Sequence, residues 1–448
     1  MQSLAYSRRS FMCRSVAATA AAYWMSGFSN RAFAVDSPFV AANETIQQAR
    51  KVGLGLLQPK EADLARGLEL HANSLVFDAY GFAPRGATDA EAINAAVKLG
   101  ASEAELLDLR EELPMTTPAT NEVERREFLE AFRAAGVSCI FQNAGEEGSD
   151  PLRLIKRLAR FTFLTDVLKE ECSKALTPAD VVAAKKAGKL CLAFTTNGVP
   201  LTLTWESVRD ELRYIRVFRQ LGVHMMHVTY NRRNHLGDGA GEPNDGGLSD
   251  FGHAAVAEMN RLGIIVDVAH SGWRTSLEAA KASQKPMVAS HTTCAGLYKH
   301  FRGKPDDTIK AICETGGYVG MCCISKFLGG KGDLNSLLDH LDYAIKKFGA
   351  DHVAIGTDVA YASRNGAAEQ AKIMKRPDGK PVFSGTSSKW EHLWPADPYQ
   401  QTTEGVQSLS WTNWPLFTVG LVQRGHSDET IRKVLGENVL RVWKANQS

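Results

Sequence analysis

Short runs of apolar and β-branched residues recur from residue 75 onward, and they constrain the fold more than any other feature of the chain. The eight runs cover residues 75–80, 138–142, 191–196, 225–230, 264–270, 287–291, 318–324 and 353–358. Intervening segments such as 254–262 and 334–348 space their apolar residues as amphipathic helices do. Apolar strands that alternate with helices are typical of a parallel sheet covered on both faces. Eight such units predict an α/β fold, a closed (β/α)8 barrel of the TIM type.

A doubly wound open sheet is the alternative arrangement of the same units. It is less favoured, because no Gly-rich phosphate-binding sequence follows the first run at 75–80. No internal repeat or second domain is evident, so residues 35–448 are predicted to form one barrel domain. Two long connections, 84–135 and 361–403, are expected to form lids or interface elements over one face of it.

Polar residues stand at the carboxyl ends of the predicted strands. In a parallel barrel these ends converge on one face, and the chemistry of such barrels takes place there. The sequence therefore predicts a functional site built from strand ends. Its candidate residues are Tyr80, Asn143, Asn197, Tyr230, Asn231, His270, Ser290, His291 and Asp358.

The first 34 residues have the three-part order of an export signal. Ser-Arg-Arg-Ser-Phe-Met at 7–12 precedes an Ala-rich run at 16–25, and Ala-Phe-Ala at 32–34 offers a cleavage site. This order predicts a twin-arginine signal peptide over 1–34 and a mature protein in the periplasm that begins near Val35. A short amphipathic helix that opens the fold is the alternative interpretation.

Charge and composition exclude several classes of partner. The chain has 52 basic and 50 acidic residues, so no basic face points to nucleic acid. No segment approaches the roughly 20 apolar residues of a membrane span. Several of the eight cysteines stand inside apolar runs, where a thiol behaves as a small buried hydrophobe, and neither a disulfide framework nor a structural zinc motif is expected.

Six further stretches form an ordered set of short motifs. They are Gly-Leu-Ser-Asp-Phe-Gly at 247–252, Glu-Met-Asn-Arg-Leu-Gly at 258–263, Val-Asp-Val-Ala-His at 266–270, Ala-Ser-His at 289–291, Ile-Gly-Thr-Asp at 355–358 and Gly-Glu-Asn-Val-Leu-Arg-Val at 436–442. In this order they resemble the signature of the membrane (renal) dipeptidases, peptidase family M19. Their order and separation cover most of the chain after residue 34. The resemblance implies a barrel of the metallo-dependent hydrolase type, a peptide or peptide-derived small molecule as substrate, and a homodimer.

The same resemblance implies two zinc ions bridged by a carboxylate, which activate a water molecule for attack on a peptide carbonyl. Several of the family's ligand positions are substituted in this chain. The His-x-Asp pair of the first strand falls at Tyr80 and Phe82, and the bridging Glu falls at Asn197. The substrate-polarising His falls at Tyr230. A dinuclear zinc centre is therefore not expected.

Other family positions keep their residues. By resemblance, His270, His291 and Asp358 are the candidate ligands of one zinc ion, and Arg302 is the candidate ligand of a substrate carboxylate. The alternatives are core hydrogen bonds for the histidines, a helix cap or an ion pair for Asp358, and a surface salt bridge for Arg302. The candidate catalytic residues are Asp358 and Tyr230, and the candidate substrate-binding residues are Arg302, Tyr230, Tyr80 and Asn197, with the two tyrosines as plain wall residues otherwise. The remaining histidines considered, His224, His227, His235 and His253, are expected to be exposed or structural.

Three functions are compatible with these residues. The first is a role in the periplasmic maturation of a peptide siderophore, which resemblance to the dipeptidase-like proteins of pyoverdine maturation implies. The second is an active metallodipeptidase that works with a single zinc ion. The third is a non-catalytic scaffold for periplasmic maturation enzymes.

Overall fold

The computed structural model describes residues 38–145, 150–376, 379–383 and 394–447, so the predicted signal peptide over 1–34 lies outside the described residues. Eight parallel strands follow one another around the barrel in the order β1-β2-β4-β5-β6-β7-β8-β9, and the predicted (β/α)8 architecture is confirmed. They are β1 (Phe77–Gly81), β2 (Cys139–Asn143), β4 (Leu190–Thr196), β5 (Val223–His227), β6 (Ile265–Asp267), β7 (Val288–Thr292), β8 (Tyr318–Met321) and β9 (Val353–Ile355).

One strand was not predicted. The short strand β3 (Cys172–Lys174) pairs with β4 beside the barrel path. Its three residues, Cys-Ser-Lys, include two polar ones, so no apolar run marks it in the sequence. It extends the sheet outside the barrel and contributes nothing to the strand ends.

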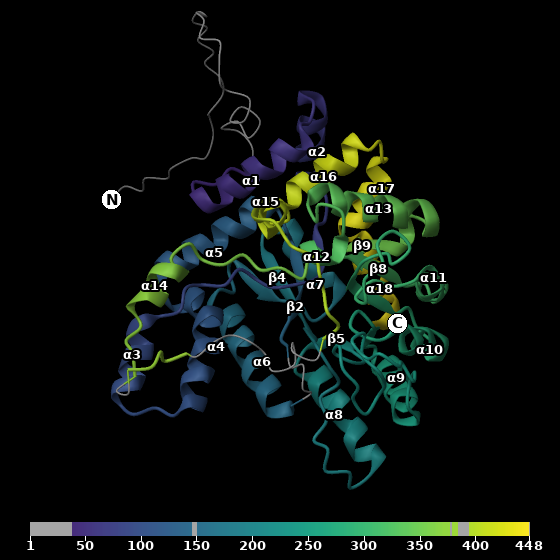
Figure 1. Ribbon diagram of the computed structural model, residues 1–448, viewed down its shortest axis with the longest axis horizontal. Helices are drawn as coiled ribbons and strands as arrows, with labels where there is room; N and C mark the ends of the chain where they lie inside the picture. Colours follow the sequence, from purple (N-terminus) through teal and green to yellow (C-terminus); the bar gives the residue numbers. More distant parts are fainter. Residues whose placement is uncertain (1–37, 146–149, 377–378, 384–393, 448) are drawn as a thin grey trace, which may run out of the picture.

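Helices surround the strands, as Figure 1 shows, with α1, α2 and α16 grouped at the top of the view and α9, α10 and α11 at its right. The predicted helices 254–262 and 334–348 correspond to α9 and α13. The longer helices are α1 (Glu44–Leu57), α2 (Glu61–Asn73), α3 (Ala90–Lys98), α4 (Glu103–Thr120), α5 (Glu122–Ala135), α6 (Pro151–Val167), α7 (Pro178–Lys186), α8 (Val208–Gln220), α9 (Asp250–Leu262), α10 (Trp273–Ala282), α11 (Asp306–Glu314), α13 (Leu334–Phe348), α16 (Trp414–Gln423) and α18 (Asn438–Gln447). The shorter ones are α12 (Ser325–Leu328), α14 (Gly366–Lys372), α15 (Thr403–Ser408), α17 (Asp428–Arg432), η1 (Ala350–His352), η3 (Trp411–Asn413) and η4 (Lys433–Glu437).

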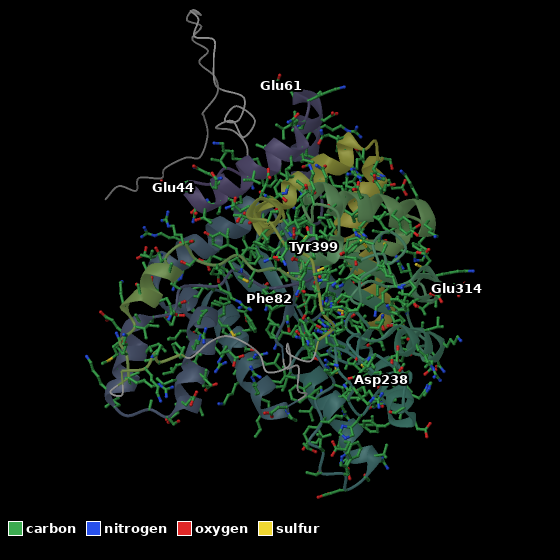
Figure 2. The ribbon with its side chains drawn as sticks, viewed as in Figure 1. Glu44, Glu61, Phe82, Asp238, Glu314 and Tyr399 are labelled. Carbon is green, nitrogen blue, oxygen red and sulfur yellow. The ribbon has the colours of Figure 1, made fainter. Side chains whose placement is uncertain are left out.

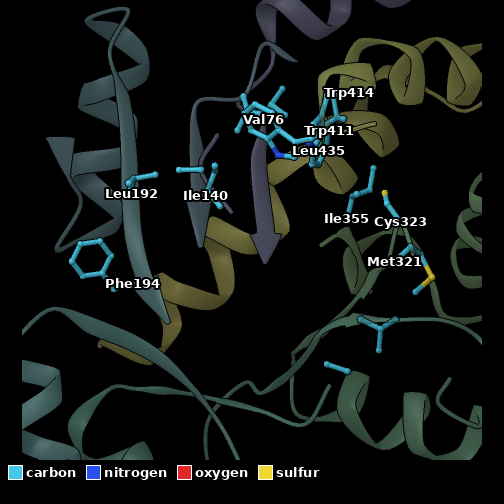
Figure 3. Close-up of a cluster of buried hydrophobic side chains, with 14 of the residues drawn as sticks. Val76, Ile140, Leu192, Phe194, Met321, Cys323, Ile355, Trp411, Trp414 and Leu435 are labelled. Atoms are coloured by element: carbon cyan, nitrogen blue, oxygen red, sulfur yellow. The ribbon is translucent and has the colours of Figure 1, made fainter. Parts of the chain in front are cut away.

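Alternation along the strands divides the core into two layers. On β2, Cys139 and Phe141 belong to the cluster inside the barrel, whereas Ile140 belongs to the cluster between strands and helices. Figure 3 shows members of the outer cluster, among them Ile140, Leu192 and Trp414. Inside the barrel the indole of Trp443, on α18, packs 5.2 Å from the ring of Phe141. Apolar side chains therefore fill the end of the barrel that α18 covers, and polar ones collect at the opposite end.

The barrel closes between β1 and β9 through a side chain. The carboxylate of Asp78 accepts hydrogen bonds from the backbone N–H of Thr357 at 2.9 Å and from its hydroxyl at 2.6 Å. It also accepts one from the indole N–H of Trp411 at 3.0 Å. A backbone bond from the N–H of Asp358 to the carbonyl of Tyr80, at 3.0 Å, continues the seam. The hydrogen bonds of Asp78 therefore join β1 to the residues that follow β9, as backbone hydrogen bonds join neighbouring strands elsewhere in the barrel.

The two long connections pack against each other. The first contains α3, α4 and α5, and the second contains α14. The side-chain amide of Asn94 donates to the carbonyl of Lys372 at 3.0 Å and accepts from the N–H of Met374 at 2.8 Å.

No helix of the described residues is long and apolar enough to cross a membrane.

Candidate functional site

The strand-end residues meet at one place, as the sequence predicts. The ring of Tyr80, on β1, stacks on the imidazole of His291, on β7, with centroids 3.8 Å apart and planes 15° apart. The ring of Tyr230 stacks on His270 at 4.2 Å. The two imidazoles meet through their Nε2 atoms, which are 2.8 Å apart. Residues far apart in the chain thus form one compact layer, which we call the histidine layer (Tyr80, Tyr230, His270 and His291).

Tyr80, Phe82 and Asn197 line the β1 and β4 side of this layer. The phenol of Tyr80 donates a hydrogen bond to the amide oxygen of Asn197, and both side chains are at most 2% exposed. The ring of Phe82 meets that of Tyr80 edge-on at 6.2 Å and lies under the guanidinium of Arg85 at 5.0 Å. The resemblance to the family predicts its metal anchors at these positions, which here supply a phenol, a phenyl ring and an amide.

Hydrogen bonds fix the orientation of the two imidazoles. Nδ1 of His270 lies 2.8 Å from the amide oxygen of Asn231, which can only accept, so this nitrogen carries the proton. Nδ1 of His291 lies 2.9 Å from the hydroxyl of Ser290. Asn231 has a positive φ of 43°, a left-handed conformation that is often found where a site holds a side chain in a fixed place.

The charge state of the histidine pair follows from its surroundings. Burial, reinforced by the Arg302 guanidinium, lowers the pKa of both His270 and His291 well below the ordinary value. Both imidazoles are therefore neutral near pH 7. A neutral imidazole is the form that binds metal ions or exchanges a proton.

Arg302 lies directly behind the pair. Its guanidinium donates to the carbonyl of Ala269 and to the carbonyl of His291 at 3.4 Å, and it lies 3.4 Å from Nε2 of His270. The ring of Phe327 lies 5.5 Å below it. Because the side chain is 1% exposed, the surface salt bridge considered as an alternative is wrong. The binding of a substrate carboxylate stays a prediction.

Asp358 is half-buried at the end of β9, with a positive φ of 56°. Burial raises the pKa of its carboxyl to about 7, against the attraction of Arg302, which lowers it. A carboxyl that is half protonated near pH 7 is suited to transfer a proton. Its predicted roles in catalysis and metal binding stay predictions.

The group of three ligand atoms that lie close together differs from the predicted set. Within the described residues, atoms of His227, Asp267 and His291 all lie within 4.8 Å of one another. Only His291 is common to this set and to the predicted ligands His270, His291 and Asp358. Nε2 of His227 is 2.8 Å from Oδ2 of Asp267, and both side chains are fully buried.

Of the four histidines expected to be exposed or structural, His224 and His227 are buried, whereas His235 and His253 are exposed. His227 follows Met225 on the same face of β5, and Met225 belongs to the core inside the barrel. That two-residue alternation was the signal in the sequence that could have placed His227 inside.

The described end of the second long connection lies over loops that follow barrel strands. The indole of Trp394 lies 5.8 Å from the ammonium of Lys326, which follows β8. A carboxylate oxygen of Asp397 lies 3.4 Å from Nε2 of His300, which follows β7. Figure 2 labels Tyr399, of the same segment, near the middle of the molecule, as it does Phe82. These contacts agree with the predicted lid as far as residues 394–399 are concerned.

The family model for the membrane dipeptidases, peptidase family M19, matches residues 90–371. The chain belongs to this family. A curated relative, Dipeptidase verJ of Clonostachys rogersoniana, is 26% identical over 271 residues, which are 60% of this chain and 58% of that protein. The match thus spans less than two thirds of the relative.

Several solved structures are similar to this chain in fold. An amidohydrolase from Pseudomonas aeruginosa is 26% identical with a TM-score of 0.62, over 85% of this chain and 98% of that one. The probable dipeptidase PvdM of the same organism is 20% identical with a TM-score of 0.59, over 86% and 98%. A metallopeptidase from Rhodobacter sphaeroides, liganded with a phosphinate mimic of L-Ala-D-Ala, is 17% identical with a TM-score of 0.58, over 84% and 100%. The last two support the barrel fold alone.

The family is one of metal-dependent hydrolases, and a metal centre sets requirements for the donors that surround it. A bridged pair of ions needs a carboxylate between them, and Asn197, whose amide oxygen accepts from Tyr80, supplies none. A single ion needs two or three closely placed nitrogen or oxygen donors, which the described residues supply at His227, Asp267 and His291. This donor set fits one transition-metal ion, and the number of ions that the chain binds stays a prediction.

Proposed function

We propose that this member of the dipeptidase family is exported by the twin-arginine route and acts in the periplasm on a peptide-derived small molecule, during maturation of a peptide siderophore of the pyoverdine type. One observation carries the proposal. At the barrel mouth, Tyr80 and Asn197 are bonded to each other on one side, while His270, His291 and Arg302 are kept on the other. Such a mouth retains groups that bind a peptide and lacks a centre for two-metal hydrolysis.

The retained groups have distinct chemical uses. The planar guanidinium of Arg302 suits the carboxylate of a peptide terminus, provided that the ligand displaces one of its carbonyl partners. Asp358, whose pKa burial raises to about 7, can give or take a proton at the pH of the periplasm. The half-buried ring of Tyr230 offers an aromatic face and a hydroxyl beside them.

The cellular part of the proposal rests on sequence. The arginine pair at 8–9, the Ala-rich run and the small-residue cleavage site support twin-arginine export and a periplasmic location. Resemblance to the dipeptidase-like proteins of pyoverdine maturation, together with the fold shared with the probable dipeptidase PvdM, supports the siderophore as substrate.

Deletion of the gene in its own host tests the proposal. We expect siderophore fluorescence to fall and an immature peptide precursor to accumulate, measured by mass spectrometry of the periplasm and the medium. The wild-type gene should restore the product. The Arg8→Lys, Arg9→Lys double variant, which makes the same mature chain but lacks the arginine pair, should not. Unchanged siderophore in the deletion strain contradicts the proposal.

A second candidate, a dipeptidase with one metal ion, is favoured by the donors at His227, Asp267 and His291. It predicts that the purified mature chain hydrolyses members of a dipeptide panel with one equivalent of zinc. The scaffold alternative predicts no turnover of any peptide and full complementation by a His270→Asn, His291→Asn double variant. Complementation and turnover together therefore separate the three functions.

A further inference from the structure

A group of donors inside the barrel lies beside the histidine layer and shares one residue, His291, with it. His227 ends β5 and Asp267 ends β6, and the two residues are partners in the register of these strands. The ring of His227 lies 5.2 Å from that of His270 and 5.4 Å from that of His291. We call His227, Asp267 and His291 the inner triad.

Polar atoms of the inner triad are buried without hydrogen bonds. Among the described residues, both ring nitrogens of His227 and the Oδ2 atom of Asp267 have no partner in hydrogen-bond geometry. Nε2 and Oδ2 approach to 2.8 Å, but they do not point at each other as donor and acceptor do. Burial of such atoms is costly unless something satisfies them. This arrangement is the one expected of two ligand atoms that both face the position of a bound ion.

The other oxygen of Asp267 is held in place. Oδ1 accepts from the N–H of Ala269 at 2.9 Å and from the N–H of Ser290 at 3.0 Å. These bonds fix the carboxylate so that Oδ2 faces His227. Fixing one oxygen and leaving the other to a cation is how carboxylate ligands are commonly oriented.

We propose that the inner triad is a binding site for one divalent transition-metal ion, with zinc as the first candidate. Two imidazoles and one carboxylate are a common donor set for zinc and for other first-row ions, and they leave coordination positions open. The site differs from the set His270, His291 and Asp358, since two of its three ligands come from within β5 and β6.

His291 can serve this site without losing its support. Without the metal, Nε2 of His291 donates to Nε2 of His270, because Nδ1 of His270 holds that ring's proton for Asn231. Moving the proton of His291 to Nδ1, where the Ser290 hydroxyl lies at 2.9 Å, frees Nε2 for the ion. His270 keeps the Arg302 guanidinium 3.4 Å from its Nε2. The metal and the retained arginine then occupy adjacent places.

Nearby charges permit a cation here. The carboxyl group of Asp267 accepts hydrogen bonds from the backbone N–H groups of Ala269 and Ser290, and it is the acidic ligand of the triad. Lys304, the second buried cation of this region, has its pKa lowered well below the usual range by burial and by Arg302. Its ammonium donates to the carbonyl of Ser271 and to the Ser276 hydroxyl at 2.9 Å, so it faces away from the triad.

Metal binding by the mature chain tests this inference. Stripped protein is titrated with zinc against a chromophoric chelator, and bound metal is counted by mass spectrometry; cobalt supplies an absorption spectrum that reports nitrogen and oxygen ligation. We expect one equivalent in the wild type. The variants His227→Asn, Asp267→Asn and His291→Asn should each lose at least about 100-fold in zinc affinity, more than loss of an outer-shell partner costs.

Matched variants separate the two ligand sets. His270→Asn and Asp358→Asn should stay within about tenfold of the wild type, and His253→Asn, an exposed histidine on α9, should equal it. Asp267→Asn keeps Oδ1 and places an amide against His227, so it should fold. The far-ultraviolet circular dichroism of each variant checks that it is folded. If Asp267→Asn is not folded, His227→Asn alone tests the triad.

Three results would overturn the inference. The first is that the wild type binds no zinc at micromolar concentrations. The second is that His270→Asn and Asp358→Asn lose zinc while the triad variants keep it. The third is that His227→Asn leaves the cobalt spectrum unchanged. The inference concerns the barrel of the proposed function but does not rest on the siderophore role. If the deletion leaves the siderophore unchanged but the chain binds zinc, only the proposed function fails. If the deletion lowers the siderophore but the chain binds no zinc, only the metal site fails.

Discussion

Two buried carboxylates, Asp78 on β1 and Asp267 on β6, lie in the same barrel but differ in how many of their oxygens accept hydrogen bonds. Asp78 has both oxygens occupied, by Tyr80 and Thr357 on one and by Thr357 and Trp411 on the other. Asp267 has one oxygen occupied and the other facing His227 without a hydrogen bond. The first arrangement joins two strands at the seam of the barrel. The second leaves capacity for a ligand.

The difference indicates how a family fold can keep its frame while its site changes. Stability is concentrated where every polar atom is satisfied, and function is expected where one is not. Asp358 is a third case. It is half-buried and in a left-handed conformation, and its carboxyl makes no hydrogen bond to another described residue. These three acids make the comparison testable.

Asp78→Asn should cause the largest loss of stability. The new amide group would turn its N–H bonds toward the indole N–H of Trp411, which also donates, and the bond at 3.0 Å would be lost. We expect the free energy of unfolding to fall by about 2–4 kcal/mol, as for a buried donor left unsatisfied beside a disrupted network. Asp267→Asn keeps the hydrogen-bonded Oδ1 and replaces an oxygen that has no hydrogen bond, so it should cost about 1 kcal/mol or less. Urea denaturation of the mature chain measures both, and equal losses would contradict the comparison.

Zinc should distinguish the same two variants in the other direction. An ion that binds only the folded chain raises the free energy of unfolding by about 2.7 kcal/mol at one hundred times its dissociation constant. We expect this gain in the wild type and in Asp78→Asn, and at most about 0.4 kcal/mol in Asp267→Asn at the same concentration, because its affinity is at least about 100-fold lower. Thermal unfolding with and without zinc reports it. A gain that survives in Asp267→Asn would remove that residue from the ligand set.

The pH dependence should reveal Asp358. Its folded-state pKa, about 7, lies above the value of 3.8 expected for the unfolded chain, so the folded state holds the proton over the interval between them. Stability from this group is present at low pH and is lost as the pH rises toward and through about 7. Asp78, whose pKa burial also raises to about 7, acts in the same direction.

Asp358→Asn should therefore be more stable than the wild type at pH 8, by about 1–2 kcal/mol, with a smaller difference at pH 5. Asn also tolerates the positive φ of this position. Denaturation curves at several pH values give the slope. An unchanged slope would mean that the carboxyl is not held protonated by the fold, and the case for proton transfer would weaken.

The sequence predicted the frame well because alternation and strand length depend on local residues. All eight barrel strands were found, but the predicted run 264–270 extends beyond β6, which ends at Asp267. The chain leaves the sheet there because Oδ1 of Asp267 captures the N–H of Ala269 two residues on. Such a turn depends on the orientation of one side chain, which apolar periodicity does not report.

The site was predicted in part for a similar reason. Tyr80, His270 and His291 stand at strand ends, and the barrel brings them together as expected. His227 lies three residues before the end of the predicted run 225–230, so it was not recognised as a site residue. Its place inside the barrel depends on where β5 ends and on its register with β6, which sets His227 opposite Asp267. Those are tertiary facts.

The smallest expected effect concerns the satisfied side of the mouth. Tyr80→Phe removes the phenol that donates to Asn197 but keeps the ring that stacks on His291 at 3.8 Å. The loss of one buried hydrogen bond should lower the free energy of unfolding by about 0.5–1.5 kcal/mol. Zinc affinity should change by less than about threefold, because no atom of the inner triad is altered. A large loss of zinc affinity would make the phenol part of the metal site, and the division of the mouth into a satisfied side and a ligand-binding side would have to be redrawn.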